Sequence, residues 1–146
     1  KLDNVLVDAT SGEALCVIDL DTVMPGLAAH DFGDLVRSAV TGRPEDEAQR
    51  ERITVRMDVF AGLADGYLAG AADWITGPER TALVTGAVVI TWEQAVRFLT
   101  DHLAGDVYYP VADPDHNLRR ARAQLRLLDR LLAREDELRT IIDAAG

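Results

Sequence analysis

Near the N-terminus of this chain, apolar and polar residues follow the short period that is typical of β-strands. Residues 5–7 and 14–20 predict two strands, the second with the sequence ALCVIDL. The intervening segment DATSGE is typical of a tight turn, because Asp and Ser bond to nearby backbone groups and Gly tolerates positive φ. These segments predict a β-hairpin, followed by a loop that Pro25 and Gly26 interrupt.

The rest of the chain has apolar residues at mainly helical spacing. The pattern predicts four helices, over residues 31–40, 45–69, 77–103 and 115–144. Pro78 suits the first turn of the third helix, where its missing N–H is not needed. The fourth helix carries an apolar stripe at steps of three and four residues, formed by Leu118, Ala121, Leu125, Leu128 and Leu132. The predicted fold is therefore mainly α, with one β-hairpin at its N-terminal end.

Length and charge narrow this picture. A chain of 146 residues predicts a single domain over residues 1–146. Residues 1–112 hold eight basic and 18 acidic side chains, whereas residues 113–146 hold seven of each. This acidic balance argues against a dedicated nucleic-acid partner, because such affinity comes from basic side chains that neutralise phosphates.

The single cysteine, Cys16, excludes a disulfide within the chain and predicts a cytoplasmic location. Its apolar neighbours in the predicted strand predict that it is buried. No uninterrupted apolar run approaches the length of a membrane span, so no membrane partner is expected.

The predicted hairpin places chemically useful side chains at its open end. Asn4 precedes the first strand and Asp19 ends the second, so an amide oxygen and a carboxylate are expected side by side. Mg²⁺ binds through one or two such ligands and completes its coordination with water and substrate phosphates. Asp21 is the alternative ligand, because alternation along a continued strand puts it on the same face as Asp19.

Residues 1–4 have the sequence KLDN, residues 17–26 have VIDLDTVMPG and residues 30–34 have HDFGD. These stretches resemble the aminoglycoside-phosphotransferase (phosphotransferase enzyme) superfamily: KLDN resembles the end of the kinase catalytic loop H-x-D-x-x-x-x-N, and the other two resemble the segment after it. RFLTD, GDVYY and HNL farther along are also similar to that group, and most similar to N-acetylhexosamine 1-kinases. The resemblance implies the C-terminal lobe of a kinase-like fold and an ATP-dependent enzyme.

The resemblance also implies roles for individual residues. Asn4 and Asp19 would bind Mg²⁺, with Asp19 at the position that bridges the metal to the β- and γ-phosphates of ATP. Lys1 would contact the transferred phosphate as a catalytic residue. Asp31 would be a buried structural aspartate at a helix start that bonds back to the catalytic loop.

The same resemblance implies that essential parts lie outside this chain. The catalytic aspartate would stand five residues before Asn4, upstream of Lys1, and the nucleotide-binding N-terminal lobe would precede it. We therefore expect this chain alone to be inactive and its missing N-terminal lobe to be a partner. We also expect an apolar surface near the hairpin that self-association would cover.

Polar and aromatic residues near position 110 are candidates for substrate recognition. Aromatic rings stack on sugar rings, and amide and guanidinium groups bond to hydroxyls. This cluster comprises Tyr108, Tyr109, His116, Asn117 and Arg120. The expected substrate is an N-acetylhexosamine or a related sugar, phosphorylated on a hydroxyl; an aminoglycoside or amino alcohol is the alternative. A second class of function is a non-catalytic helical module that pairs through the leucine stripe.

Overall fold

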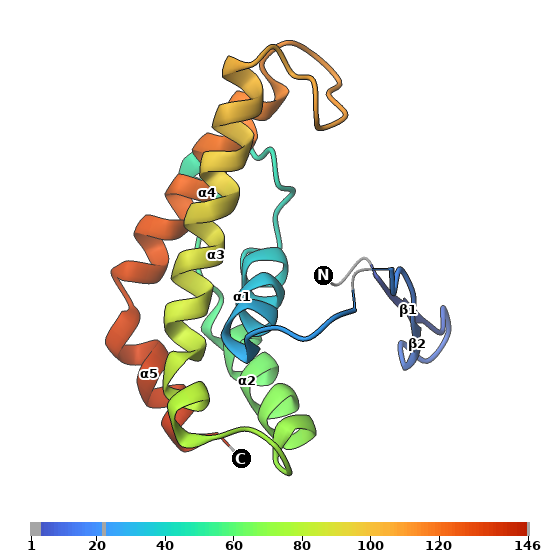
Figure 1. Cartoon of the computed structure of the whole chain (residues 1–146), viewed down its shortest axis with the longest axis vertical. Helices are drawn as coiled ribbons and strands as arrows, with labels where there is room; N and C mark the ends of the chain where they lie inside the picture. The colour runs from blue at the N-terminus through green and yellow to red at the C-terminus, as the bar shows by residue number, and fades with distance from the viewer. Residues whose placement is uncertain (1–3, 22, 146) are drawn as a thin grey trace.

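The computed structural model describes residues 4–21 and 23–145 of the chain. Five α-helices form an elongated body, and a two-stranded antiparallel sheet stands to one side of it (Figure 1). This architecture confirms the predicted mainly α fold with an N-terminal hairpin.

The hairpin forms from β1 (Val5–Val7) and β2 (Ala14–Val17), with Val5 opposite Val17. Its turn is closed by the carboxylate of Asp8, which accepts hydrogen bonds from the backbone N–H groups of Thr10 and Ser11. These N–H groups lower the pKa of Asp8. Gly12 has φ +74°, a conformation that costs glycine little. The turn therefore forms from the residue types that predicted it.

The second strand is shorter than predicted and ends at Val17 rather than residue 20. Pairing extends one step further, because the N–H of Ile18 donates to the carbonyl of Asn4 at 2.9 Å. Asp19 then adopts φ +61°, which takes the chain out of the strand conformation. This change of direction ends the ladder.

The hairpin is exposed along most of its length. Cys16, predicted to be buried, is exposed, as is every other residue of β2. A set of exposed apolar side chains extends from the hairpin into the segment before the first helix: Leu6, Val7, Leu15, Val17, Ile18, Leu20, Val23, Met24 and Leu27. The apolar surface expected there is present, and its coverage by another copy stays a prediction.

The helical body is built around one long central helix. α1 (Ala28–Ala39) and α4 (His116–Leu132) both lie along α3 (Gly77–Leu103), and α2 (Met57–Ala71) packs at one end of α1 (Figure 1). α3 begins with a capping box: the Thr76 hydroxyl accepts from the Glu79 N–H, and the Glu79 carboxylate accepts from the Thr76 N–H. Phe32 and Phe60 meet edge to face in the core at 5.8 Å between ring centroids.

The second predicted helix is wrong over its first part. Residues 45–56 form irregular chain with a short 3₁₀ helix, Arg50–Arg52, and α2 begins only at Met57. Ile53 and Val55 are buried while Thr54 and Arg56 are exposed. Their spacing of two is that of extended backbone, and the N–H of Arg56 donates to the carbonyl of Val40.

The last predicted helix is two helices. α4 ends at Leu132, and α5 (Glu135–Ala144) turns back to pack Leu138 and Ile142 into the core. The predicted leucine stripe is not the buried face either, because Leu125 and Leu132 are exposed. The buried side chains of α4 are Asn117, Ala121, Ala123, Gln124, Leu127 and Leu131. Two amides, Asn117 and Gln124, therefore lie in the core at positions outside the predicted stripe, and of the stripe itself only Ala121 is fully buried.

By length and composition α3 is apolar enough to cross a membrane, which the sequence analysis did not anticipate. In this structure it is the central helix of the body (Figure 1), and Leu83, Ala87 and Phe98 on its inner face are buried. A core helix of a helical bundle passes the same composition test. Its apolar content is explained in part by this packing.

Candidate functional site: a hairpin carboxylate–amide pair and a cleft along the central helix

Asn4 and Asp19 lie together at the open end of the hairpin. The Asn4 amide Nδ2 donates to the Asp19 carboxylate Oδ2 at 3.1 Å. The pairing of Ile18 with Asn4 fixes this juxtaposition, since it brings the residue before β1 beside the residue that follows β2. The two side chains predicted as metal ligands are thus neighbours.

The backbone at Asp19 supports a functional interpretation of this pair. Among the non-glycine residues that the structure describes, only Asp19 and Asp106 have positive φ. Such conformations cost of order 1 kcal/mol or more and gather at functional sites. Asp tolerates the left-handed region better than most residues. At Asp19 this conformation accompanies the hydrogen bond to Asn4.

The donor set fits a hard cation that keeps other ligands. The side chains of Asn4 and Asp19 offer two oxygen-bearing groups, and Asp19 is exposed. Within residues 4–21 and 23–145, no group of three or more His, Cys, Asp or Glu side chains is placed to hold a metal ion. The pair therefore suits Mg²⁺ that takes its remaining ligands from water and phosphates, rather than an all-protein metal cage.

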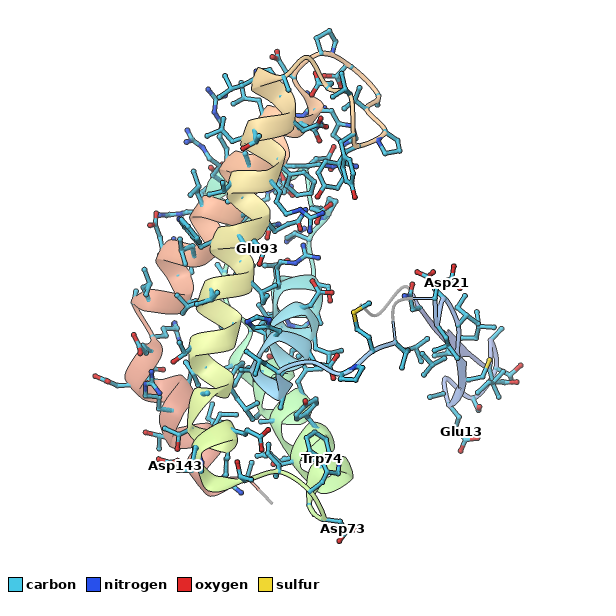
Figure 2. All side chains as sticks on the ribbon, viewed as in Figure 1. Glu13, Asp21, Asp73, Trp74, Glu93 and Asp143 are labelled. Atoms are coloured by element: carbon cyan, nitrogen blue, oxygen red, sulfur yellow. The ribbon has the colours of Figure 1, made fainter. Side chains whose placement is uncertain are left out.

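The other residues predicted near this site are placed differently. Asp21 is exposed at the opposite end of the hairpin from Glu13 (Figure 2), and in the described part of the chain no hydrogen bond joins it to Asn4. Lys1 lies outside the described residues. Asp31 is exposed, whereas the resemblance implied a buried aspartate, and it lies in the first turn of α1, which begins three residues earlier at Ala28.

Asp31 is close enough to Tyr67 to affect its ionisation. Burial of the Tyr67 phenol, with the negative charge of Asp31 as the next cause, raises the pKa of Tyr67 to about 12. The Tyr67 hydroxyl also donates to the Ala28 carbonyl at 3.2 Å. Asp31 and Tyr67 therefore join the start of α1 to α2.

A second feature is an open cavity of about 550 Å³ beside α3. Its walls come from α1, from the segment after α1, from α3, from the loop 104–115 and from α4. We call it the α3 cleft. The lining residues are Asp34, Arg37, Glu45, Ile90, Glu93, Gln94, Arg97, Phe98, Tyr109, Pro110 and Arg120.

Cations and aromatic rings alternate along one wall of the α3 cleft. The Arg120 guanidinium lies over the Phe98 ring at 5.3 Å, the Phe98 and Tyr109 centroids are 4.8 Å apart, and Arg97 lies 5.8 Å from the Tyr109 centroid. Each contact is within the range in which a ring quadrupole attracts a cation or another ring. The stack holds the Tyr109 and Arg120 side chains against α3.

The charges around the α3 cleft are balanced. Arg37 bonds to Asp34 at 2.8 Å and to Glu45 at 2.7 Å, and Arg120 Nε lies 3.7 Å from Glu45. Arg97 and Glu93 are 3.9 Å apart. Opposite charges beside the buried Arg37 guanidinium raise its pKa despite desolvation, which is the largest single influence and acts in the other direction. The cleft thus offers three cations and three anions, each with an opposite charge within 4.0 Å.

Of the five predicted substrate residues, Tyr109 and Arg120 line the α3 cleft. Tyr108 is exposed and is not among the lining residues. His116 accepts a hydrogen bond from the Ala112 N–H at Nδ1, and its Nε2 lies 3.4 Å from Asp46. Asn117 is fully buried and bonds to Asp101, Asp106 and Arg120.

Sequence reasoning missed most of the α3 cleft. Asp34, Arg37 and Glu45 belong to it, yet they stand more than 40 residues before the next lining residue in the sequence, Ile90. Within one helix, Ile90, Glu93, Gln94 and Arg97 recur at the spacing of one face, which is a signal that the apolar pattern alone did not use.

In a comparison with protein families, the sequence model described as "Phosphotransferase enzyme family" matches residues 1–84 of this chain. The matched segment contains the hairpin with Asn4 and Asp19, all of α1 and α2, and the start of α3.

Proposed function

The chain belongs to the phosphotransferase enzyme family, and from this premise we propose that it forms the acceptor-binding and metal-binding part of an ATP-dependent kinase that phosphorylates a hydroxyl of a sugar. The observation that carries the proposal is the contact between Asn4 and Asp19 inside the matched segment. An N-acetylhexosamine is the proposed acceptor class.

In this proposal Asn4 and Asp19 hold the metal that accompanies ATP. When bound, Mg²⁺ supplies charge neutralisation on the phosphates during transfer. Asp19 contributes the only formal charge of the pair, and Asn4 fixes its orientation through the 3.1 Å hydrogen bond. The hairpin ladder keeps the two side chains together before the substrate arrives, which reduces the cost of ordering the site.

The α3 cleft is the proposed acceptor site. Hydroxyl groups accept from guanidinium donors such as Arg120 and donate to carboxylates such as Glu45, and Tyr109 offers a ring for the apolar face of a sugar. Because the charges of the cleft are paired with one another, a polycationic aminoglycoside gains no net attraction there. This balance favours a neutral sugar over the cationic alternatives.

The proton of the acceptor hydroxyl must pass to a base during transfer. We propose that this base is an aspartate upstream of Lys1, and that the intact enzyme adds a nucleotide-binding lobe to this chain. The test is ATP consumption by the intact enzyme with Mg²⁺ and a panel of neutral sugars, aminoglycosides and amino alcohols. Turnover with a neutral sugar is expected. Turnover confined to the cationic acceptors would contradict the sugar assignment, and no turnover at all would contradict the kinase proposal.

Replacing Arg120 with alanine is expected to raise the KM for the sugar by about tenfold, because a hydrogen bond to a charged donor contributes about 1.5–3 kcal/mol. The KM for ATP should not change, since Arg120 lies in the acceptor cleft. Arg122→Ala is a matched control, because Arg122 is exposed and is not among the lining residues of the α3 cleft. Equal sugar KM values for both variants would remove Arg120 from acceptor binding.

A further inference from the structure

The end of α3 holds a buried carboxylate that organises the loop after it. Asp101 is 5% exposed and lies in the last turn of α3. Its Oδ1 accepts from the N–H groups of Val107 at 3.0 Å and Tyr108 at 2.8 Å, and its Oδ2 accepts from the N–H of Tyr109 at 2.9 Å. Three successive backbone donors thus converge on one side chain.

Asn117 extends this arrangement to the next helix. Its amide Nδ2 donates to Asp101 at 2.8 Å and to Asp106 at 2.9 Å. Its Oδ1 accepts from the Arg120 guanidinium at 3.1 Å. Asn117 is fully buried, so these bonds satisfy an amide that would otherwise be costly in the core.

The four hydrogen bonds to Asp101 favour its ionised form. The N–H of Tyr109 has the largest effect in lowering the pKa of Asp101, followed by those of Tyr108 and Val107 and the Asn117 amide, while burial opposes them. A charged carboxylate is a stronger acceptor than a neutral one. The loop is therefore closed by a group that stays charged at neutral pH.

Asp101 and Asn117 are hydrogen-bonded to Tyr109 and Arg120, and both of these partners line the α3 cleft. Asp101 fixes the backbone of Tyr109, and Asn117 orients the Arg120 guanidinium, which also donates to the Pro110 carbonyl at 3.1 Å. Neither Asp101 nor Asn117 lines the cleft. They therefore act on its contents only through Tyr109 and Arg120.

We propose that Asp101 and Asn117 are positioning residues for the acceptor: they set the distance between the Tyr109 ring and the Arg120 guanidinium that together grip the sugar. This inference rests on the proposed function. It assigns to a buried Asp–Asn pair, more than 80 residues after Asp19 in the sequence, control over how tightly the acceptor binds.

The test compares Asp101→Asn with Asp113→Asn in the intact enzyme. The first variant keeps the shape of the side chain but removes the charge and places a donor among backbone donors. The second removes a carboxylate from the same loop that bonds to Arg119 at 2.8 and 2.7 Å and does not line the cleft. Asp101→Asn is expected to raise the sugar KM by about tenfold or more and to leave the ATP KM unchanged, because small displacements of a positioning group have large effects.

If Asp101 only stabilised the fold, Asp101→Asn would reduce the amount of folded enzyme. The apparent kcat would then fall while the KM values for sugar and ATP stayed unchanged, and this result would overturn the proposal. A second readout is amide hydrogen exchange at Val107, Tyr108 and Tyr109 in the 146-residue chain, followed by NMR. Faster exchange in Asp101→Asn, and no change in Asp113→Asn, is expected; unchanged protection in Asp101→Asn would overturn the proposal without any assay of activity.

These outcomes distinguish a failure of the positioning role from a failure of the proposed function. If the unaltered enzyme phosphorylates a sugar and Asp101→Asn leaves the sugar KM unchanged, the positioning role is wrong and the proposed function stands. If the unaltered enzyme phosphorylates no sugar, the proposed function is wrong, and the positioning role that rests on it is wrong too.

Discussion

Asp19→Asn is expected to lower the kcat of ATP-dependent phosphotransfer by about 10³-fold, the scale on which single groups that stabilise transition-state charge act. The substitution removes the negative charge that the Asn4–Asp19 pair offers to a cation. Asparagine also tolerates positive φ, so the backbone at φ +61° is retained. The loss would then report on the charge and not on a local change of fold. The measurement is kcat at saturating ATP, Mg²⁺ and sugar.

Glu13→Gln is the matched control for Asp19→Asn. Glu13 is an exposed carboxylate of the same hairpin and lies at the opposite end from Asp21 (Figure 2). Glu13→Gln should leave kcat within a factor of about two of the value for the unaltered enzyme, since exposed charges contribute little to function at a distance. Binding of Mn²⁺ in the presence of ATP, followed by electron paramagnetic resonance, gives a readout that does not depend on turnover.

Asp21→Asn decides between the two metal ligands that the sequence left open. The structure places Asp19, and not Asp21, in hydrogen-bond contact with Asn4. A large loss of kcat and of Mn²⁺ binding in Asp21→Asn, together with normal values in Asp19→Asn, would contradict the proposed ligand pair.

Gly86→Ala is expected to destabilise the fold by about 3 kcal/mol or more, at the upper end of the range for overpacked sites. A Cβ at Gly86 would lie 1.9 Å from the Ala29 carbonyl oxygen and 2.5 Å from its carbon. Across the same contact, a Cβ at Gly33 would lie 2.5 Å from the Gly86 carbonyl oxygen. The clash is with backbone on both sides, so no side-chain rotation relieves it, and α1 must move away from α3.

Gly66→Ala is the control for Gly86→Ala. Gly66 lies inside α2, is exposed, and a Cβ there meets no atom within 4 Å. Alanine should stabilise the helix at that position by about 0.5–1 kcal/mol, because glycine loses more backbone entropy on folding. Urea unfolding followed by circular dichroism measures both variants. A Gly86→Ala protein as stable as the unaltered chain would show that the α1–α3 contact is not as close as the structure has it.

The close contact at Gly86 also bears on function. Asp34 and Arg37 on α1 face Glu93, Gln94 and Arg97 on α3 across the α3 cleft. The spacing between the two helices sets the width of that cleft. Because Gly33 and Gly86 allow the backbones of α1 and α3 to meet, a side chain at either position is expected to widen the cleft.

Prediction from the sequence was most accurate where structure is set by neighbouring residues. The strand Val5–Val7 and the helix over residues 77–103 were predicted with the bounds that the structure shows. The turn formed by Asp8 and Gly12 relies on contacts within six residues. The placement of Asn4 beside Asp19 follows from that same hairpin, because strand pairing brings together residues of known offset.

Prediction failed where distant segments compete for one surface. Ile53 and Val55 were assigned to a helix, but both are buried by packing in an extended segment. The sequence around Arg134 has no proline or glycine that would predict the end of a helix. The chain nevertheless turns there, and this turn brings Leu138 and Ile142 into the core. Tertiary burial is worth about 1.5–3 kcal/mol for each large apolar side chain, which exceeds differences in helix propensity.

The sequence by itself thus determined the mainly α fold, the N-terminal hairpin, the family and the Asn4–Asp19 pair. Only the tertiary structure decided that Arg37, Glu45, Tyr109 and Arg120 share one cleft, and that Asp101 and Asn117 hold it in shape. The physical reason is the range of the interactions. A hairpin is specified by contacts over a few residues, whereas the cleft requires α1, α3 and α4 to approach closely, and the pattern of single residues along a chain does not record which helices meet.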